Sequence, residues 1–178
     1  KLHQIEVFSF QDFNYDGVYD ESDNPFPNQK FSLTPSAKVK FSNSAGTTYY
    51  FAKNGEYELK HQENTLWELT TQPEVHSIEI NENSELPIYY FGFKPTRILP
   101  RVEPHLSSSP TRCNTSAIYW LSYSNTGTTI GAGIVTLEVD ELMDFIEATP
   151  QPDVIENGTL SWYFSDLYPS YHNKIRLE

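Results

Sequence analysis

Five oxygen-bearing side chains recur at a regular spacing near the start of the chain. They occupy positions 1, 3, 5, 9 and 12 of a DxNxDGxYDxxD run and are Asp12, Asn14, Asp16, Asp20 and Asp23. Calcium prefers six to eight oxygen ligands at roughly 2.3–2.6 Å, and a twelve-residue loop can surround the ion when alternate side chains point inward. The spacing therefore predicts a calcium site with these five side chains as ligands.

Two further residues of the run fit the same site. Gly17 provides the residue without Cβ that the bend after the third ligand requires, and we expect the backbone carbonyl of Val18 to be the next ligand. Position 12 is Asp23 rather than a longer Glu, which predicts a modest affinity of about 10⁻⁴ to 10⁻³ M, as in extracellular modules. The alternative is a solvated acidic turn. The repulsion between the aspartates favours calcium, and we expect the loop to be poorly ordered without it.

The flanks of the run indicate what kind of calcium site it is. Residues 3–10 alternate in the manner of a strand, and residues 30–34 form the next expected strand. Pro25 and Pro27 between them make a helix improbable. An EF-hand needs two helices and a dockerin-like module needs a second copy of the loop, and the sequence contains neither. The calcium loop is therefore expected to join two strands.

Composition narrows the class of protein. The chain has 178 residues, which is enough for one large or two small domains, and its 15% aromatic content with 12 Pro and 8 Gly favours sheets and turns. Its net charge of −12 argues against binding to nucleic acid or anionic membranes. The single cysteine, Cys113, excludes an internal disulfide and is expected to be buried and unreactive. No membrane-spanning segment or signal peptide is visible, so we expect a mature segment of a larger secreted protein.

The first half alternates apolar and polar residues in short runs. The expected strands beyond residue 34 are 37–42, 47–53, 56–61, 66–70, 76–80 and 87–93. Asn54-Gly55 predicts a type I′ hairpin between 47–53 and 56–61, because that turn requires positive φ at both central residues. Seven or eight short strands with regular turns are typical of a β-sandwich.

Residues 5–95 carry a specific resemblance. Its motifs are DFNYDGVYDESDNPFPNQKFSLTP at 12–35, SNSAG at 42–46, YYFAKNGEYEL at 49–59, WELTT at 67–71 and ELPIYYFGFKP at 85–95. This stretch resembles the calcium-binding, SdrD B-like B-type repeats of bacterial surface adhesins, in the prealbumin-like family that includes collagen-adhesin B domains. The resemblance implies a calcium-binding sandwich in a large surface or secreted protein, most often of the Bacteroidota. No intramolecular isopeptide bond is predicted, because neither its lysine nor its asparagine can be placed.

A change in composition separates the two halves. Residues 96–112 contain three prolines and a Ser107–Ser109 run with little alternation, which is typical of a linker or crossover. We therefore predict two tandem β-sandwich domains, at 1–97 and 98–178. Strands in the second are expected at 116–124, 133–139, 145–149, 159–164 and 174–177, with a turn at 125–128 and one possible helical turn at 140–144.

The second half also resembles a known family. The motifs are WLSYSNTGTT at 120–129, VTLEVDE at 135–141, TPQPD at 149–153 and NGTLSWYFSDLYP at 157–169. They are similar to repeat-type immunoglobulin-like domains of bacterial surface proteins, including those exported by the type IX system. In those families a pair of strands follows the last motif. The resemblance therefore implies a second sandwich that is incomplete at its C-terminal end or ends on an exposed edge, where strand addition or dimer contacts are favoured.

Signals for catalysis are weak. The five histidines show no zinc-ligand spacing and are expected to be surface or strand residues. No GxSxG elbow, P-loop or dinucleotide turn occurs, and Cys113 has no identifiable base. A glycosidase carboxylate pair is defined by a separation that sequence does not give. The glycosylation patterns at Asn114 and Asn157 are interpreted as turns. The sequence therefore predicts no enzyme.

The aromatic residues leave one alternative function open. Trp67, Trp120 and Trp162, with the Tyr49-Tyr50 and Tyr89-Tyr90 pairs, fit sugar stacking in a carbohydrate-binding accessory module of a secreted enzyme. The core of a sandwich is the expected place for such residues, because a doublet in a strand puts one ring inward and one outward.

The favoured interpretation is a non-catalytic structural or adhesive module at the cell surface or outside the cell, with one Ca²⁺. Its expected partners are neighbouring domains of the same polypeptide and a glycan or protein of the host or environment. Nucleic acid and membrane insertion are not expected.

Overall fold

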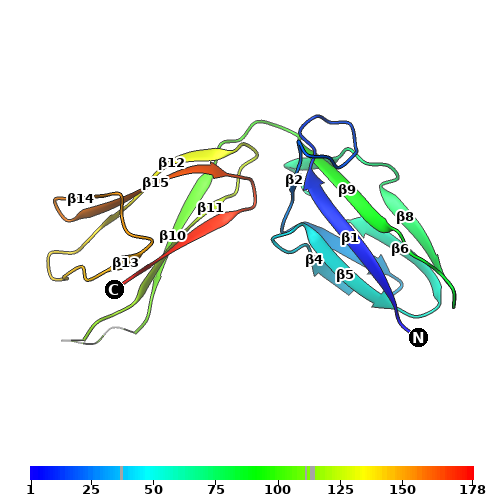
Figure 1. Ribbon diagram of the computed structural model, residues 1–178, viewed down its shortest axis with the longest axis horizontal. Coiled ribbons are helices and arrows are strands. Elements are labelled where there is room, and N and C mark those ends of the chain that lie inside the picture. The colour runs from blue at the N-terminus through cyan, green and yellow to red at the C-terminus, as the bar shows by residue number, and fades with distance from the viewer. Residues whose placement is uncertain (37, 111, 113–114) are drawn as a thin grey trace. The chain divides into compact units, whose positions relative to one another are not determined.

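A computed structural model describes residues 1–36, 38–110, 112 and 115–178. Its regular structure consists of strands, and the described residues contain no helix. The prediction of an all-β fold is therefore confirmed. The chain divides into two compact units, Lys1–Arg97 and Ile98–Glu178, and each unit contains two sheets (Figure 1).

The first unit is built around the parallel pairing of its first and last strands. β1 (His3–Gln11) pairs in parallel with β9 (Ile88–Pro95) and antiparallel with β5 (Thr47–Ala52). β2 (Asn24–Pro25) extends β1, and β7 (Trp67–Leu69) pairs with β9. The second sheet has the order β4-β3-β6-β8 and consists of β4 (Lys38–Phe41), β3 (Lys30–Thr34), β6 (Gly55–His61) and β8 (Val75–Ile80).

Both sheets of this unit contribute alternate side chains to one core. The first sheet supplies Ile5, Val7, Tyr50, Phe91 and Phe93, and the second supplies Phe31, Leu33, Leu59, Ile78 and Ile80. The hydroxyl of Tyr50 donates a hydrogen bond to the carbonyl of Phe31 at 2.8 Å and so joins the sheets. Burial raises the pKa of Tyr50 to about 12, so the hydroxyl remains a donor at any physiological pH.

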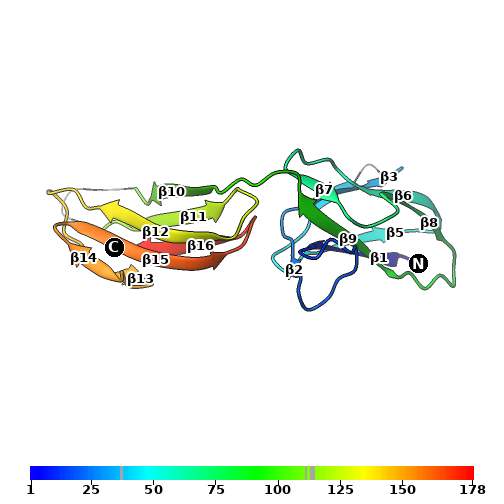
Figure 2. The ribbon, with the colours of Figure 1, turned by 90° about the horizontal axis from the view of Figure 1, so that it is seen from above.

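The second unit consists of a four-stranded and a three-stranded sheet (Figure 2). The order β10-β11-β16-β13 comprises β10 (Val102–Ser108), β11 (Tyr119–Asn125), β16 (His172–Leu177) and β13 (Ala148–Thr149). The order β12-β15-β14 comprises β12 (Gly131–Glu138), β15 (Thr159–Leu167) and β14 (Val154–Glu156). Leu121 and Ile175 from one sheet and Val135, Leu160 and Trp162 from the other form the centre of its core.

The predicted turn at 125–128 is present and is held by a buried amide. Asn125 donates to the carbonyls of Thr129 and Leu167, both at 2.7 Å, and accepts from the amide of Gly127 at 2.9 Å. Gly127 cannot carry a side chain, because a Cβ there would lie 2.1 Å from the carbonyl oxygen of Leu99. The turn at Asn157-Gly158 joins β14 to β15, and both residues have positive φ (49° and 79°).

The predicted hairpin at Asn54-Gly55 is wrong. β5 pairs with β1, whereas β6 pairs with β3 and β8, so the connection crosses from one sheet to the other. Gly55 has φ of 153°, a conformation that favours glycine, but in this crossover it does not form a two-residue hairpin. The dipeptide indicated a glycine-dependent turn and gave no information about the sheet in which the next strand lies.

Three expectations for the second unit also need correction. The supposed linker at 96–112 contains β10, an edge strand in which Pro104 is tolerated because only one side of the strand is paired. Residues 140–144 form a turn, closed by the amide of Met143 on the carbonyl of Asp140 at 2.9 Å, rather than a helical turn. The strand at 145–149 is reduced to β13, and β14 was not predicted. Cys113 and Asn114 lie outside the described residues, as does residue 37 at the start of the strand predicted at 37–42.

Candidate metal site

The acidic run forms the loop between β1 and β2. Its two ends are fixed by the ladder that pairs Phe10 with Pro25 and Gln11 with Asn24. The first acidic residue, Asp12, is anchored a second time, because its backbone amide donates to the carbonyl of Phe93 in β9 at 2.9 Å. The loop therefore begins and ends on the first sheet. The strand β2 at its end was not predicted, and the strand expected after the loop at 30–34 is β3, in the second sheet.

Asp12 is the most deeply placed of the predicted ligands. It is 1% exposed. Its Oδ1 accepts a hydrogen bond from the amide of Tyr15 at 2.6 Å, and its Oδ2 accepts one from the amide of Gly17 at 2.8 Å. A buried carboxylate that accepts two backbone N–H groups organises the turn that follows it.

Asp23 plays the matching role at the other end of the loop and is 6% exposed. Its Oδ1 accepts from the amide of Phe13 at 3.0 Å and its Oδ2 from the amide of Asp20 at 3.2 Å. Asp12 and Asp23 thus hold the loop from opposite ends, and each reaches across to backbone groups of the segment between them.

The remaining three predicted side chains form a connected group. The amide nitrogen of Asn14 donates to Oδ2 of Asp16 at 3.0 Å and to Oδ2 of Asp20 at 3.3 Å. Oδ1 of Asn14 accepts from the amide of Asp16 at 3.0 Å, and Oδ1 of Asp16 accepts from the amide of Val18 at 2.8 Å. Oδ1 of Asp20 accepts from both the amide and the hydroxyl of Ser22, at 2.7 and 2.6 Å. The structure therefore brings Asn14, Asp16 and Asp20 into direct contact.

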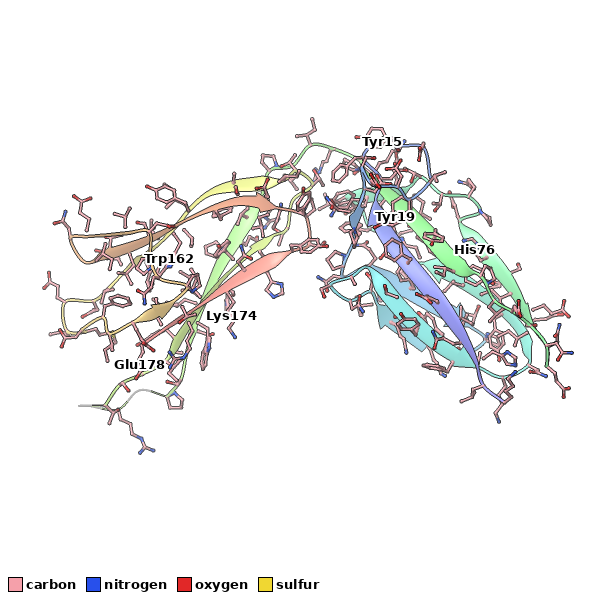
Figure 3. The ribbon with its side chains drawn as sticks, viewed as in Figure 1. Tyr15, Tyr19, His76, Trp162, Lys174 and Glu178 are labelled. Atoms are coloured by element: carbon pink, nitrogen blue, oxygen red, sulfur yellow. The ribbon has the colours of Figure 1, made fainter. Side chains whose placement is uncertain are left out.

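The backbone of the loop explains its glycine. Gly17 has φ of 75°, and a Cβ at this position would lie 3.0 Å from the carbonyl oxygen of Thr70. Tyr15 also has a positive φ, 65°, and its ring lies at the outer end of the loop with Lys94 Nζ 5.9 Å from its centre (Figure 3). Val18, whose carbonyl was predicted as a ligand, has an exposed side chain, so the chain at that position is accessible to solvent.

The carboxylates differ in their electrostatic environment. The pKa of Asp23 is raised above its ordinary value of 3.8, chiefly by burial and further by the neighbouring charges of Asp12 and Asp20. The pKa of Asp20 is lowered, chiefly by the hydrogen bonds from Ser22. A cation among these groups would stabilise the ionised form of Asp23. It would therefore offset the part of the pKa rise that comes from the charges of Asp12 and Asp20.

The donor set fits a hard cation. All five predicted side chains offer oxygen, which is the ligand type that calcium and magnesium select. Across the described part of the chain, however, no three His, Cys, Asp or Glu side chains converge closely enough to hold a metal ion. The loop carboxylates are instead directed at loop amides and at the Asn14 side chain.

Comparison with known proteins gives no further guidance. The chain matches no family model, no curated protein and no solved structure. Within the described residues, no helix is both long enough and apolar enough to cross a membrane. Any statement about function therefore rests on the residues themselves.

Sequence reasoning missed the role of Tyr19, which lies within the acidic loop. Its ring packs at 4.7 Å from the ring of Phe8 and at 5.4 Å from that of Phe10, and stacks at 6.4 Å on Tyr90 (Figure 3). The sequence of β1 could have indicated this contact. Phe8 and Phe10 alternate with the inward-facing Val7 and Ser9 and therefore lie on the outer face of the sheet, where an aromatic partner is needed. The acidic loop is therefore fastened to the outer face of the first sheet by an aromatic contact as well as by hydrogen bonds.

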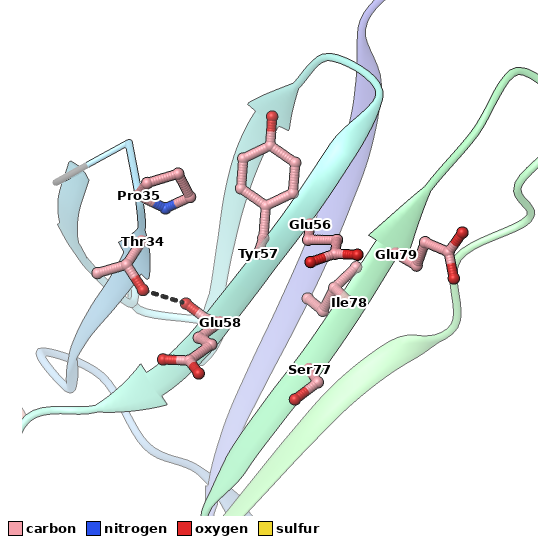
Figure 4. A pocket seen from close by; sticks show the side chains of 8 residues that line it. All are labelled: Thr34, Pro35, Glu56, Tyr57, Glu58, Ser77, Ile78 and Glu79. Carbon is pink, nitrogen blue, oxygen red and sulfur yellow. Dashed lines mark hydrogen bonds between the residues drawn. The ribbon is translucent and has the colours of Figure 1, made fainter.

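One hollow of this unit is a depression in the second sheet. It is lined by the end of β3 and by β6 and β8, and Thr34 Oγ1 donates to the carbonyl of Glu58 at 3.5 Å (Figure 4). Glu56 of β6 is the direct register partner of Glu79 of β8. The lining combines the carboxylates of Glu56, Glu58 and Glu79 with the hydroxyl-bearing Thr34, Tyr57 and Ser77.

Two histidines, His61 and His76, pack against aromatic rings. The ring of His61 contacts Phe31 and Phe93, with centres 5.6 and 4.6 Å apart, and burial lowers the pKa of His61 to about 4. His76 packs against Tyr89 and Phe91, both at 5.1 Å, and burial lowers its pKa as well. Both side chains are neutral at pH 7 and belong to strands β6 and β8, as expected for strand residues.

Proposed function

We propose that this chain is a non-catalytic structural module of a large bacterial surface or secreted protein, and that one calcium ion stabilises its 12–23 loop. The observation that carries the proposal is the arrangement of Asp12 and Asp23. These two nearly buried carboxylates stand at the two ends of a loop whose other acidic side chains occupy the remaining positions of a calcium-binding spacing. The resemblance of residues 5–95 to calcium-binding adhesin repeats agrees with it.

The roles of the residues follow from their positions. Asp12, Asn14, Asp16, Asp20 and Asp23 would hold the ion through side-chain oxygens, and Val18 through its backbone carbonyl. Bound calcium supplies positive charge that offsets the repulsion among the aspartates. At present the amide nitrogen of Asn14 donates to Asp16 and Asp20. With calcium bound, a rotation of this amide would turn its oxygen toward the ion instead. Gly17 keeps the chain close to Thr70.

The benefit of such a site is mechanical. The loop joins β1 to β2 and is tied to β9 through Asp12, so ordering it fixes the end of the central strand pair of the unit. At the predicted dissociation constant of about 10⁻⁴ to 10⁻³ M, millimolar calcium adds about 0.4–1.4 kcal/mol of stability, out of a total of about 5–15 kcal/mol for a small domain. The proposed location is extracellular or at the cell surface, where millimolar calcium would fill a weak site.

The test is a thermal melt of the whole chain in EDTA and in millimolar Ca²⁺. Calcium is expected to raise the Tm of the first unit by several degrees in the wild type, and Asp16→Asn is expected to abolish the shift. Glu21→Gln is the matched control, because Glu21 is an exposed carboxylate in the same loop at a position that supplies no ligand. An equal shift in Asp16→Asn and Glu21→Gln, or no shift in the wild type, would refute the calcium proposal.

A second candidate function is carbohydrate binding, and a specific surface favours it. Tyr49 and Tyr90 are the outward-facing members of their doublets, 37% and 41% exposed, on the same face of the first sheet. Phe51 and Ile88 are also exposed there. Exposed rings on a sheet stack on sugar rings. On a glycan array, selective binding that is lost in Tyr90→Ala and retained in Tyr163→Ala, an exposed tyrosine of the other unit, would favour this function.

A further inference from the structure

One of the three tryptophans lies outside the hydrophobic cores. Trp67 and Trp162 are 7% and 3% exposed and belong to the cores of the first and second unit, whereas Trp120 is only partly buried. Trp120 lies in β11, in which Leu121 and Tyr123 point into the core. Because successive residues of a strand point to opposite faces, Trp120 lies on the outer face of the four-stranded sheet.

Strand register places polar side chains beside this indole. Ser122 is paired with His105 of β10 on one side and with Lys174 of β16 on the other. Ser124 is paired with His172 in the next row. Residues directly opposite on neighbouring strands point to the same side of a sheet, so these side chains share the outer face. We call this surface the β11 face and define it by His105, Trp120, Ser122, Ser124, His172 and Lys174.

The β11 face is a sheet surface and not a strand edge. Any further strand would hydrogen-bond beside β10 or β13, which are the outer strands of this sheet. The side chains of β11 and β16, the two central strands, keep their outward direction whatever lies beyond those edges.

Lys174 supplies a positive charge that no carboxylate of the described residues neutralises. Its side chain is exposed, on the opposite side of β16 from the core residue Trp162 (Figure 3). Its Nζ lies 5.3 Å from the centre of the Trp120 ring. The two other cations near this sheet, Arg101 and Arg176, are in ion pairs with glutamates. An aromatic ring attracts a cation without removing its charge, so Trp120 positions an ammonium group that remains available to an anion.

The acidic residues of the second unit are concentrated on the other sheet. The three-stranded sheet and the turns beside it carry Asp153, Glu156, Asp166 and all four carboxylates of residues 138–144. By contrast, β11 and β16 contain no acidic residue. Glu103 of β10, which is in register with Ser124, is paired with Arg101. An anionic ligand therefore meets less repulsion at the β11 face than at the opposite sheet of the same unit.

The rest of the face offers hydroxyl and ring N–H groups. Ser122 Oγ donates to the carbonyl of His105 at 3.3 Å, which leaves its lone pairs free to accept. His105 and His172 are exposed on the strands that flank β11, and an imidazole carries at least one N–H in either protonation state. Short hydroxyl side chains between two rows of longer donors suit a ligand that is rich in hydroxyl and anionic oxygens.

We propose that the β11 face binds an acidic polysaccharide through a carboxylate or sulfate group that pairs with Lys174. The exposed part of the Trp120 indole packs against the sugar ring that carries this group. Hydroxyls of the neighbouring sugars exchange hydrogen bonds with the serines and histidines of the face. This site is separate from the tyrosine surface of the first unit, and it requires no calcium.

Other anionic occupants fit this face less well. An extended peptide is bound through main-chain hydrogen bonds at a sheet edge, and β11 is already paired on both sides. A folded protein partner needs an apolar centre in its interface, and Trp120 is the one large apolar side chain of the β11 face. Nucleic acid needs several phosphate contacts, and Lys174 is the only lysine or arginine of the face. A polysaccharide needs one anionic contact supported by hydroxyl groups.

The experiment uses the whole chain in EDTA at low salt with three soluble probes. Oligogalacturonate carries carboxylates, sulfated dextran carries sulfates, and neutral dextran carries neither. Titration calorimetry is expected to show binding of one or both acidic probes and no binding of neutral dextran, and the tighter acidic probe identifies the anion. Nuclear magnetic resonance is expected to place the shifts at the indole N–H of Trp120 and at the amides of residues 172–176. EDTA prevents the acidic probes from binding through calcium in the 12–23 loop.

Substitutions at Lys174 test the central contact. Lys174→Gln removes a charge-assisted hydrogen bond and is expected to weaken binding of the acidic probe by at least about fivefold. Lys174→Arg keeps the charge and is expected to retain binding. Lys53→Gln is the matched control, because it makes the same change in net charge at an exposed lysine of the first unit.

Four results would each overturn the proposal. They are an equal loss of affinity in Lys174→Gln and Lys53→Gln, resonance shifts confined to the other sheet or the other unit, no binding of either acidic probe, and binding of polyglutamate as tight as that of the acidic sugars. The last result would assign the face to acidic peptides instead. Because all measurements are made in EDTA, none of these results bears on the calcium site.

Discussion

The carboxylate of Asp12 accepts a hydrogen bond from the backbone amide of Gly17, five residues further along the same loop, at 2.8 Å. The contact requires the chain to turn back sharply, and the φ of 75° at Gly17 provides the turn. Because a side chain at Gly17 would also press on the carbonyl of Thr70, at 3.0 Å, the position is restricted by both conformation and space. Gly17→Ala is expected to destabilise the first unit by about 1–3 kcal/mol, measured by urea unfolding.

Gly158→Ala provides the control for that prediction. Gly158 has a similar φ of 79°, but a Cβ there would meet only the carbonyl of Val139 at 3.9 Å, which is an ordinary contact. It is expected to cost about 1 kcal/mol from conformation alone. The difference between the two variants therefore measures the contact with Thr70. If Gly17→Ala costs no more than Gly158→Ala, the loop does not press on Thr70, the residue that follows β7.

The pH dependence of calcium stabilisation should follow Asp23. Its pKa is raised above 3.8 in the folded protein by burial and by Asp12 and Asp20. Without metal, Asp23 therefore contributes its full stability below the unfolded pKa and loses it as the pH rises through the folded pKa. Calcium binds the ionised form, so the rise in Tm on adding Ca²⁺ is expected to be largest at pH 7 and to disappear as the pH falls through the raised pKa.

Two variants separate this effect from general acid denaturation. Asp23→Asn removes the titrating group and is expected to give a small calcium shift at every pH. Glu21→Gln leaves Asp23 in place and is expected to retain the wild-type profile. Melts in EDTA and in Ca²⁺ from pH 4 to 8 measure both. A calcium shift that persists unchanged at pH 4 in the wild type would show that Asp23 does not take part.

The acidic loop could be located from sequence because its information is local. The spacing from Asp12 to Asp23 and the glycine at position 6 belong to one short segment, and the structure places this segment after the predicted strand β1. The two-residue strand β2 at its other end was not predicted. The burial of Asp12 depended on more distant residues, because its amide bonds to Phe93 in the last strand of the unit. No pattern within twelve residues encodes that contact.

The pairing of strands was less predictable for the same reason. Alternation predicted where most strands lie, including β3, β6 and β8, but not their neighbours. β5 and β6 are separated by two residues and yet lie in different sheets, because inward-facing Tyr50 and Leu59 fill the core from opposite sides. β10 was not predicted, because an edge strand that contains Pro104 and several serines has the composition of a linker.

His61 is expected to destabilise the first unit in acid. Burial between Phe31 and Phe93 lowers its pKa from 6.5 to about 4, so the folded state favours the neutral ring. A lowered histidine pKa contributes stability above the unfolded pKa and loses it as the pH falls from about 6.5 to about 4. The loss is at most about 3 kcal/mol. His61→Phe is expected to flatten this part of the stability profile.

Nuclear magnetic resonance provides the direct measurement. The ring protons of His61 are expected to titrate near pH 4. A His61 titration at its ordinary pKa would mean that water reaches the ring between the two phenylalanines. Unfolding by urea at pH 7 and pH 5 in the wild type and in His61→Phe then gives the free-energy difference for the same group.

Glu56 and Glu79 face each other across β6 and β8, and their repulsion offers a stabilising substitution (Figure 4). Like charges directly opposite on neighbouring strands destabilise a sheet, and opposite charges contribute roughly 0.2–1 kcal/mol. Glu79→Lys is therefore expected to raise the stability of the first unit by about 0.5–1 kcal/mol at low salt.

Glu74→Lys is the control. It makes the same change in net charge in the loop before β8, where no strand partner exists among the described residues. A gain in Glu79→Lys that exceeds the gain in Glu74→Lys, and that shrinks in 1 M salt, measures the pair itself. Equal gains in the two variants would assign the effect to the overall charge of −12 instead.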